Sequence, residues 1–361
     1  MKVWLVGAGF SRRLGGPLLG DLISDTALKI LRHRHPETWL ADAHLDHTVQ
    51  TFSAGISRGM WRDAEEYMAA LASGDSTWTT RVADLLRESM AADAYGALST
   101  PSEYSSHMKP EEVVTEACWF GATQLVAAQC ADFVERSQSD PEGWLPYDRW
   151  ANAIDADDVI VSFNYDDVVE RVMARNERPL WVPNPRMPSL GSASKGHLSL
   201  LKLHGSVTFR DTILHPPEPD TVANLDRNPA YIATPGRGKR DNCLTSYLEL
   251  WRKASDAIAR CDCMCVIGYR CPPTDEMAKA MLIDSLARHD AKPTVELVLG
   301  DDHQAAARLA ALLRGLARVR NTRLFAQDYL SLVGAGTSWQ NTDIFASMFP
   351  GEPIPPGLVR D

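Results

Sequence analysis

KVWLVGAGFS, residues 2–11, joins a short apolar run to a glycine-rich turn. Residues 3–6 are apolar at both odd and even positions, which is typical of a strand that helices cover on both faces. Glycines at 7 and 9 allow a tight turn, and a helix that follows can direct free N–H groups at a phosphate. The stretch falls short of a full dinucleotide fingerprint because Arg12 occupies the third glycine position. Alone, it fits either a phosphate-binding loop or a plain strand-to-helix turn.

Four more apolar runs along the chain have the same character as the first. They cover residues 158–163, 199–204, 263–269 and 294–300. Helical patterns separate most of these runs, and alternating strands and helices form a parallel sheet with helices on both faces. The sequence therefore predicts an α/β fold with a Rossmann-like doubly wound parallel sheet.

The long segment between the first and second predicted strands has a different pattern. Apolar residues recur there at helical spacing, first around Trp61 and Tyr67 and later around Val126 and Phe133. No convincing strand interrupts them. We therefore expect a helical insertion, about residues 36–142, between the first and second strands of the sheet.

Charge and hydropathy argue against several classes of protein. The formal net charge is −10 over 361 residues, and the basic side chains are scattered along the chain. Strong non-specific attraction to nucleic acid or to an anionic membrane is therefore not expected. No apolar run reaches the roughly 18 residues that a membrane span needs. We expect a cytoplasmic protein.

Four of the seven cysteines lie within residues 261–271. Cys261, Cys263 and Cys265 alternate with other residues, which would place all three on one face of a strand. No CxxC pair of the kind that holds structural zinc is present. We interpret these cysteines as small buried hydrophobic residues of a reducing compartment, and we expect no zinc or other metal site.

Small and polar residues follow each of the five apolar runs. In an open α/β sheet, ligands bind beyond the carboxyl ends of the strands, near the point where the strand order reverses. The five groups are Gly7-Ala8-Gly9-Phe10-Ser11, Asn164-Tyr165-Asp166-Asp167, His204-Gly205-Ser206, Gly268-Tyr269 and Gly300-Asp301-Asp302. Asn164 alone could be a helix cap, and His204 alone could be a structural histidine. Their joint placement favours one site at this edge.

Four stretches of the chain, taken in order, resemble a known family. VWLVGAGFSRRLGGP, VIVSFNYDD, LLKLHGS and CVIGYRCPPTD are similar to the sirtuin-like domain of bacterial NAD-hydrolysing proteins, many of which defend the cell against phage. The similarity covers about residues 1–335. It implies one Rossmann-like NAD-binding domain over residues 1–335, and we expect an irregular tail at 336–361.

The resemblance also implies a role for each site residue. Asn164 and Asp166 match the Asn-x-Asp of sirtuins, which lies against the nicotinamide and its ribose, and His204 matches their catalytic histidine. The residues that would line the pyrophosphate and ribose of NAD are Gly7, Ala8, Gly9, Phe10 and Ser11. Those that would hold the adenosine end are Gly268, Tyr269, Gly300 and Asp301.

Two departures from the sirtuin pattern bear on the activity. Sirtuin deacylases carry a four-cysteine zinc module and an Asp-Phe-Arg after the glycine loop, whereas this chain has LGGPLLGD there and no zinc spacing. We therefore expect NAD+ hydrolysis rather than protein deacylation. A non-catalytic sensor of NAD or ADP-ribose and an NAD-dependent deacylase stay open as alternatives. A Rossmann dehydrogenase is least expected, because no acidic ribose-binding residue is evident about 20 residues after the glycine loop.

Three residues carry the expected catalysis. Asp166 would hold the carboxamide of the leaving nicotinamide, and Asn164 would orient a water toward the anomeric carbon. His204, whose ordinary pKa is near ~6.5, would accept a proton. Because unrestrained NAD hydrolysis is toxic to the host, we also expect restraint through a homo-oligomer or through an activating or restraining protein partner. The sequence leaves open whether the product is linear or cyclic ADP-ribose.

Overall fold

The computed structural model describes residues 1–34, 42–71, 76–89, 108–185, 193–209, 247–272 and 275–336. These residues contain a seven-stranded sheet in which every neighbouring pair of strands is parallel. The strands are β1 (Lys2–Val6), β2 (Val159–Ser162), β3 (Leu180–Trp181), β4 (Leu198–Lys202), β5 (Cys263–Ile267), β6 (Thr294–Val298) and β7 (Arg318–Asn321). Their order is β3-β4-β2-β1-β5-β6-β7. The predicted Rossmann-like parallel sheet is confirmed.

The strand order reverses between β1 and β5. Strands β2, β4 and β3 lie in that order on one side of β1. After β4 the chain crosses to the other side of β1, where β5, β6 and β7 follow in order. Val6 at the end of β1 is in register with Ser162 of β2 and with Ile267 of β5. The loops after these three strands therefore meet at the point where such sheets bind ligands.

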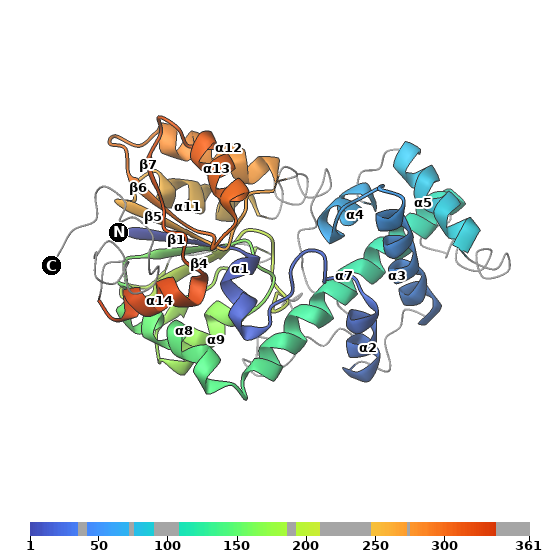
Figure 1. Ribbon diagram of the computed structural model, residues 1–361, viewed down its shortest axis with the longest axis horizontal. Coiled ribbons are helices and arrows are strands. Elements are labelled where there is room, and N and C mark those ends of the chain that lie inside the picture. Colours follow the sequence, from blue (N-terminus) through green and yellow to red (C-terminus); the bar gives the residue numbers. More distant parts are fainter. Residues whose placement is uncertain are drawn as a thin grey trace.

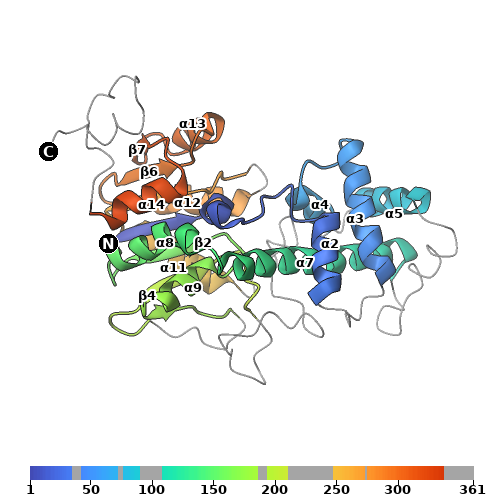
Figure 2. The same cartoon turned by 60° about the horizontal axis from the view of Figure 1, so that its bottom comes forward.

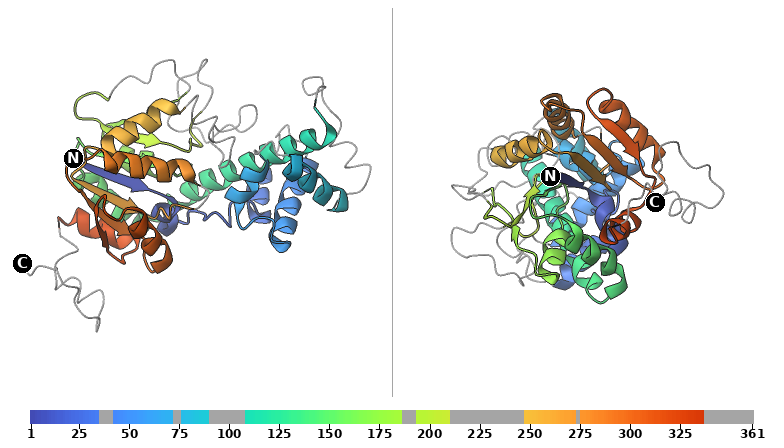
Figure 3. Two further views of the ribbon diagram at one scale, coloured as in Figure 1. Left: turned by 90° about the horizontal axis from the view of Figure 1, so that it is seen from above. Right: turned by 90° about the vertical axis from the view of Figure 1, so that its left-hand side faces the viewer.

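Helices cover both faces of the sheet (Figure 1). Helices α8 (Pro141–Ala153), α9 (Val168–Arg175) and α14 (Ala326–Gly334) pack on one face, and helices α11 (Leu248–Ile258), α12 (Glu276–Ala287) and α13 (His303–Leu312) pack on the other. The right-hand view of Figure 3 looks along the strands and shows the sheet between the two layers of helices. Trp4 and Val6 of β1 point to the α8 face, whereas Val3 and Leu5 point to the α11 face.

A helical lobe lies beside the sheet (Figures 1 and 2). It contains α2 (Asp25–Arg34), α3 (Asp42–Ser57), α4 (Ala64–Leu71), α5 (Ser76–Ser89) and the first part of α7 (Pro110–Ser137). Helix α7 has 28 residues, a length of about 42 Å, and its second part reaches the sheet.

Every element that the structure describes between β1 and β2 is a helix. Helix α2 also packs in the lobe, although it ends before residue 36, where the insertion was predicted to begin. The predicted limits of the insertion, 36–142, stay a prediction. Buried residues of the lobe, such as Leu45 and Trp61, belong to the same apolar cluster as Trp4 of the sheet. The lobe and the α8 face of the sheet therefore share one core.

The segment after β1 turns twice before the lobe begins. Helix α1 (Ala8–Ser11) is one turn long and continues into a 3-10 turn, η1 (Arg12–Leu14), which ends at Gly15 with a positive φ of 90°. None of the described helices is long and apolar enough to cross a membrane. The predicted irregular tail lies, after Gly336, outside the described residues.

Candidate functional site

The five predicted groups lie at the carboxyl ends of β1, β2, β4, β5 and β6. Because the strands are parallel, all five ends lie along one edge of the sheet. The loops after β1, β2 and β5 are the closest to the reversal of strand order, and the loops after β4 and β6 flank them. The convergence expected from the sequence is therefore present.

The glycine loop after β1 packs directly against the loop after β5. The backbone N–H of Gly7 donates to the carbonyl of Ile267, and that of Gly9 donates to the carbonyl of Gly268, both at 3.0 Å. A Cβ atom on Gly9 would lie 2.7 Å from the Cα of Gly268, which is far closer than such atoms approach. Gly268 itself has a positive φ of 64°. These glycines are therefore required by the contact between the two loops.

Phe10 anchors the glycine loop to helix α8. Its side chain is fully buried and packs edge-on against Tyr147 and Trp150 of α8. The hydroxyl of Tyr147 also donates to the backbone carbonyl of Phe10 at 2.5 Å. The loop conformation is thus fixed by the core, while contacts of residues 7–11 with NAD stay a prediction.

Asn164 connects the loop after β2 to the glycine loop. Its Nδ2 donates to the carbonyl of Gly7 at 3.1 Å and to Oγ of Ser11 at 3.2 Å. Because a carbonyl can only accept, the amide nitrogen of Asn164 must face Gly7. This geometry leaves Oδ1 as the atom that can accept a hydrogen bond from a ligand or a water. Asn164 does not cap α9, whose N-cap is Asp167.

Asp166 ends the same hydrogen-bond chain. Oγ of Ser11 donates to Oδ2 of Asp166 at 2.9 Å, so the hydroxyl of Ser11 both accepts from Asn164 and donates to Asp166. The other carboxylate oxygen accepts the backbone N–H of Val168 at 3.2 Å. Asn164, Asp166 and Ser11 are all buried. The chain of bonds holds three predicted site residues, Asn164, Ser11 and Asp166, in one fixed arrangement.

Burial makes Asp166 unusually easy to protonate. Desolvation raises the pKa of its carboxyl to about 6, although the positive charge of Lys202 and the hydrogen bond from Ser11 oppose the rise. Lys202 is itself buried, and its Nζ lies 2.5 Å from the backbone carbonyl of Asp166 and 2.7 Å from Oε1 of Glu170. A carboxylate and an ammonium group are therefore held inside the protein beside the site. Lys202 was not predicted, because a single lysine at the end of an apolar run gives no signal of its own.

His204 belongs to a second group of polar side chains. Its Nε2 lies 3.3 Å from Oδ2 of Asp275, a close contact that is not aligned as a hydrogen bond. The hydroxyl of Tyr269 donates to the same carboxylate oxygen at 2.6 Å. All three side chains are buried. A carboxylate beside an imidazole favours the proton on Nε2, which leaves Nδ1 as the basic nitrogen of the neutral ring.

Asp275 is the residue of this group that the sequence did not indicate. It stands at the N-cap position of α12, where an acidic residue is ordinary, yet its side chain makes no capping hydrogen bond. The carboxylate instead contacts Tyr269 and His204. Its position shortly after the predicted Gly268-Tyr269 turn was the one available signal.

Phe163 and Tyr269 lie where the two groups meet. The rings of Phe163 and Tyr269 stack with centroids 4.1 Å apart, and the His204 ring lies edge-on to Phe163 at 4.8 Å. Asn164 directly follows Phe163, and the backbone of Tyr269 touches Gly7. The two groups adjoin through aromatic packing.

The loop after β6 lies at the same edge of the sheet, next to the loop after β5. Gly300 has a positive φ of 63°, and its backbone N–H donates to the carbonyl of Leu324 at 2.9 Å. Asp301 is exposed, and Asp302 forms an ion pair of 2.9 Å with Arg270 in the loop after β5. The predicted adenosine-binding residues thus lie on two neighbouring loops, and their contact with NAD stays a prediction.

Comparison with known protein families assigns part of this chain to a family. The family model of the SIR2-like domain matches residues 158–314. The matched residues run from just before β2 to just after α13, so they include Asn164, Asp166 and the group around His204 but not the glycine loop of residues 7–11, which contains Ser11. The resemblance to a sirtuin-like domain is confirmed over this range. No curated protein matches the chain.

Proposed function

We propose, on the basis of the SIR2-like domain of residues 158–314, that the protein hydrolyses NAD+ at the bond between nicotinamide and ribose. Members of the SIR2-like family use NAD as a substrate or a ligand. The observation that carries the proposal is the hydrogen-bond chain from Gly7 through Asn164 and Ser11 to Asp166, beside the His204–Asp275 contact. The balanced reaction is NAD+ plus water to nicotinamide, ADP-ribose and a proton.

The reaction needs a site that stabilises positive charge on the ribose. Cleavage of a glycosidic bond passes through a state that resembles an oxocarbenium ion, and the enzyme must bind this state more tightly than NAD+ itself. The carboxylate of Asp166 provides negative charge at the edge of the sheet. It can also accept a hydrogen bond from the carboxamide of nicotinamide, which leaves as a neutral molecule.

Asn164 has the geometry for holding the attacking water. Its amide nitrogen is occupied by Gly7 and Ser11, so the direction of Oδ1 is fixed. A water that donates to Oδ1 is then held at one position relative to the loop. Fixing a reactant in this way removes part of the entropic barrier to the reaction.

His204 is the proposed base. With the proton of the neutral ring on Nε2 facing Asp275, Nδ1 accepts the proton of the water or of a ribose hydroxyl. The negative charge of Asp275 then stabilises the imidazolium that forms. Asp275 is accordingly a positioning residue, and Tyr269 holds its carboxylate in place.

Two other activities would use the same residues. A sensor would bind NAD or ADP-ribose without releasing nicotinamide. A deacylase would release nicotinamide faster when an acylated peptide is present. Neither is favoured by an additional contact in the structure, and both are separate outcomes of the test below.

The test is to incubate the purified full chain with NAD+ and to separate nicotinamide, ADP-ribose and cyclic ADP-ribose by chromatography. We expect nicotinamide and ADP-ribose without any peptide. His204→Ala should lower turnover by about 10² to 10⁴, the usual contribution of a general base. His303→Ala, an exposed histidine at the start of α13, is the matched control and should keep wild-type turnover. Binding without release, or release only with an acylated peptide, would replace the proposal by one of the two alternatives.

The proposed biological role is defence against phage through depletion of NAD. Such an enzyme must be restrained in healthy cells, and we propose that the helical lobe provides the surface for a homo-oligomer or a protein partner. Cells that produce the wild-type chain should lose NAD upon infection, and cells with His204→Ala should not. Full turnover by a purified monomer would contradict the proposed restraint.

A further inference from the structure

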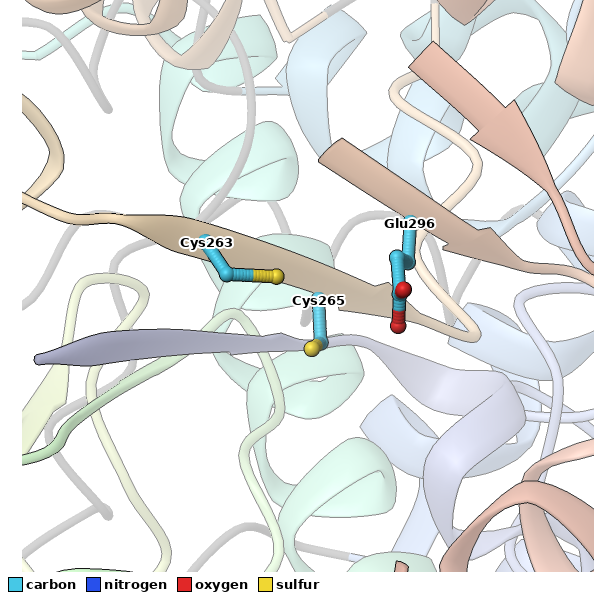
Figure 4. Close-up of side chains that lie close together, drawn as sticks. All are labelled: Cys263, Cys265 and Glu296. Atoms are coloured by element: carbon cyan, nitrogen blue, oxygen red, sulfur yellow. The ribbon is translucent and has the colours of Figure 1, made fainter. Parts of the chain in front are cut away.

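Three potential metal ligands lie together on β5 and β6, on the amino-terminal side of the proposed active site. They are Sγ of Cys263, Sγ of Cys265 and a carboxylate oxygen of Glu296, and all three atoms lie within 4.8 Å of one another (Figure 4). Cys263 and Cys265 share one face of β5, and Cys265 is in register with Glu296 of β6. The prediction that Cys261 shares this face is wrong, because Cys261 precedes the strand and packs in the opposite apolar cluster.

Glu296 is the least expected member of this cluster. It stands in the middle of β6, between Val295 and Leu297, and its side chain is half-buried on the face that α14 covers. A carboxylate in such a position is unfavourable unless it is paired. The hydroxyl of Tyr329 on α14 donates to Oε2 of Glu296 at 2.5 Å and lies 3.1 Å from Sγ of Cys265.

We propose that Cys263, Cys265 and Glu296 bind a zinc ion. Thiolate and carboxylate ligands suit Zn²⁺, which accepts sulfur at about 2.3 Å and oxygen at about 2.0–2.2 Å in a tetrahedral arrangement. Two sulfur ligands of such a site lie about 3.8 Å apart, a spacing that follows from those bond lengths. The observed limit of 4.8 Å therefore requires only small side-chain movements.

The charges around the cluster are compatible with a bound cation. Two thiolates and one carboxylate carry three negative charges, of which Zn²⁺ neutralises two. Lys2 is in register with Cys263, and Arg320 is in register with Glu296. These two basic residues can offset the remaining charge.

The surroundings also supply support for the ligands. Tyr329 is buried and fixes one oxygen of Glu296, which is how residues outside a metal shell usually orient its ligands. Cys263 is half-buried at the first position of β5, so the fourth coordination position is open to a water on that side. Zinc would thereby join β5, β6 and, through Tyr329, α14.

The proposed zinc takes no part in NAD cleavage. Cys265, the ligand of β5 nearest to the proposed active site, precedes Ile267 by two residues, which span about 7 Å of strand. The polar groups of the proposed active site lie beyond Ile267. The zinc proposal is therefore independent of the proposed function, and its test needs no measurement of NAD turnover.

The test uses the untagged full chain, loaded with Zn²⁺ and dialysed, with metal content measured by mass spectrometry. The wild type should retain about one zinc per chain. Cobalt in place of zinc should give a thiolate-to-metal charge-transfer absorption. Cys263→Ser and Glu296→Gln should each weaken binding by at least tenfold, a loss that even residues outside the metal shell can cause. Cys261→Ala, a nearby buried cysteine outside the cluster, is the matched control and should bind zinc as the wild type does.

A thermal scan provides a second measurement on the same samples. Zinc should raise the Tm of the wild type and of Cys261→Ala, because a ligand that binds only the folded state stabilises it. It should raise the Tm of Glu296→Gln by less than that of the wild type at the same zinc concentration. Glu296→Gln keeps an oxygen that can accept from Tyr329, so this variant should fold even where a Cys265 variant does not. Absence of stoichiometric zinc in the wild type would overturn the proposal, and so would zinc binding by Cys263→Ser and Glu296→Gln that is as tight as that of the wild type.

Discussion

Oδ2 of Asp275 lies 3.3 Å from Nε2 of His204, although the two residues follow different strands, β5 and β4. Both side chains are buried, and Tyr269 donates to the same carboxylate oxygen. The contact gives the imidazole a carboxylate neighbour at a fixed position. The sequence pattern did not indicate this contact.

Asp275→Asn tests the positioning role of this carboxylate. We expect kcat for NAD hydrolysis to fall by about 10- to 100-fold, less than the loss on removing the base, because the asparagine no longer stabilises the imidazolium. KM should change little, since Asp275 is not proposed to touch NAD. Asp284→Asn, an exposed acid on α12 that is not assigned to the site, is the control. An equal loss in both variants, or a loss confined to KM, would show that Asp275 has no such role.

Ser11→Ala tests the hydrogen-bond chain. Among the described residues, the hydroxyl of Ser11 links Asn164 to Asp166, and its removal leaves a buried amide hydrogen and a buried carboxylate oxygen each short of a partner. The free energy of unfolding, measured with urea, should decrease by about 1–3 kcal/mol. Ser139→Ala, an exposed serine, should change it by less than about 0.5 kcal/mol. A loss of the same small size in Ser11→Ala would contradict the inferred chain.

The raised pKa of Asp166 predicts how stability depends on pH. Burial lifts this pKa from 3.8 to about 6 in the folded protein, so between these values the folded state binds more protons than the unfolded state. Stability from this group is therefore greatest below about pH 4 and decreases as the pH rises through about 6. Asp166→Asn should remove this contribution. Urea unfolding of both proteins at several pH values between 4.5 and 7.5 should show the wild type losing stability relative to the variant, and a constant difference would exclude the shift.

Gly268→Ala tests the contact between the loops after β1 and β5. A Cβ atom there would lie 2.3 Å from the backbone nitrogen of Phe10, in addition to the strain of the positive φ. Gly59→Ala isolates the second effect, because Gly59 has a φ of 68° with no atom within 4 Å of the added carbon. The control should lose about 1–3 kcal/mol, and Gly268→Ala should lose more and bind NAD more weakly. Equal losses would mean that the loops do not need the close approach.

The sequence predicted the sheet where the apolar pattern was strong. The runs that became β1, β2, β4, β5 and β6 are apolar on both faces, because helices cover both sides of the sheet. β3 has two half-buried residues, and β7 reads RVRN with exposed arginines. These two edge strands have no apolar run to reveal them.

The sequence also predicted which loops would meet, but not which atoms. Parallel strands bring their carboxyl ends to one edge, so Asn164, Asp166 and the glycine loop could be grouped in advance. The partners of each side chain depend on how loops fold over one another. Asp275 therefore looked like an ordinary acid at the start of a helix, and Ser11 looked like a ligand contact although its hydroxyl joins Asn164 to Asp166.

The most direct test of the central claim is nicotinamide release measured together with NAD binding in Asn164→Ala. Removing the amide should abolish the ordered water while leaving the remaining contacts to NAD, so the variant should bind NAD by calorimetry and release nicotinamide at least about 10²-fold more slowly than the wild type. Asn152→Ala, an exposed asparagine on α8, should behave as the wild type in both measurements. Wild-type rates of release from a folded Asn164→Ala would contradict the account.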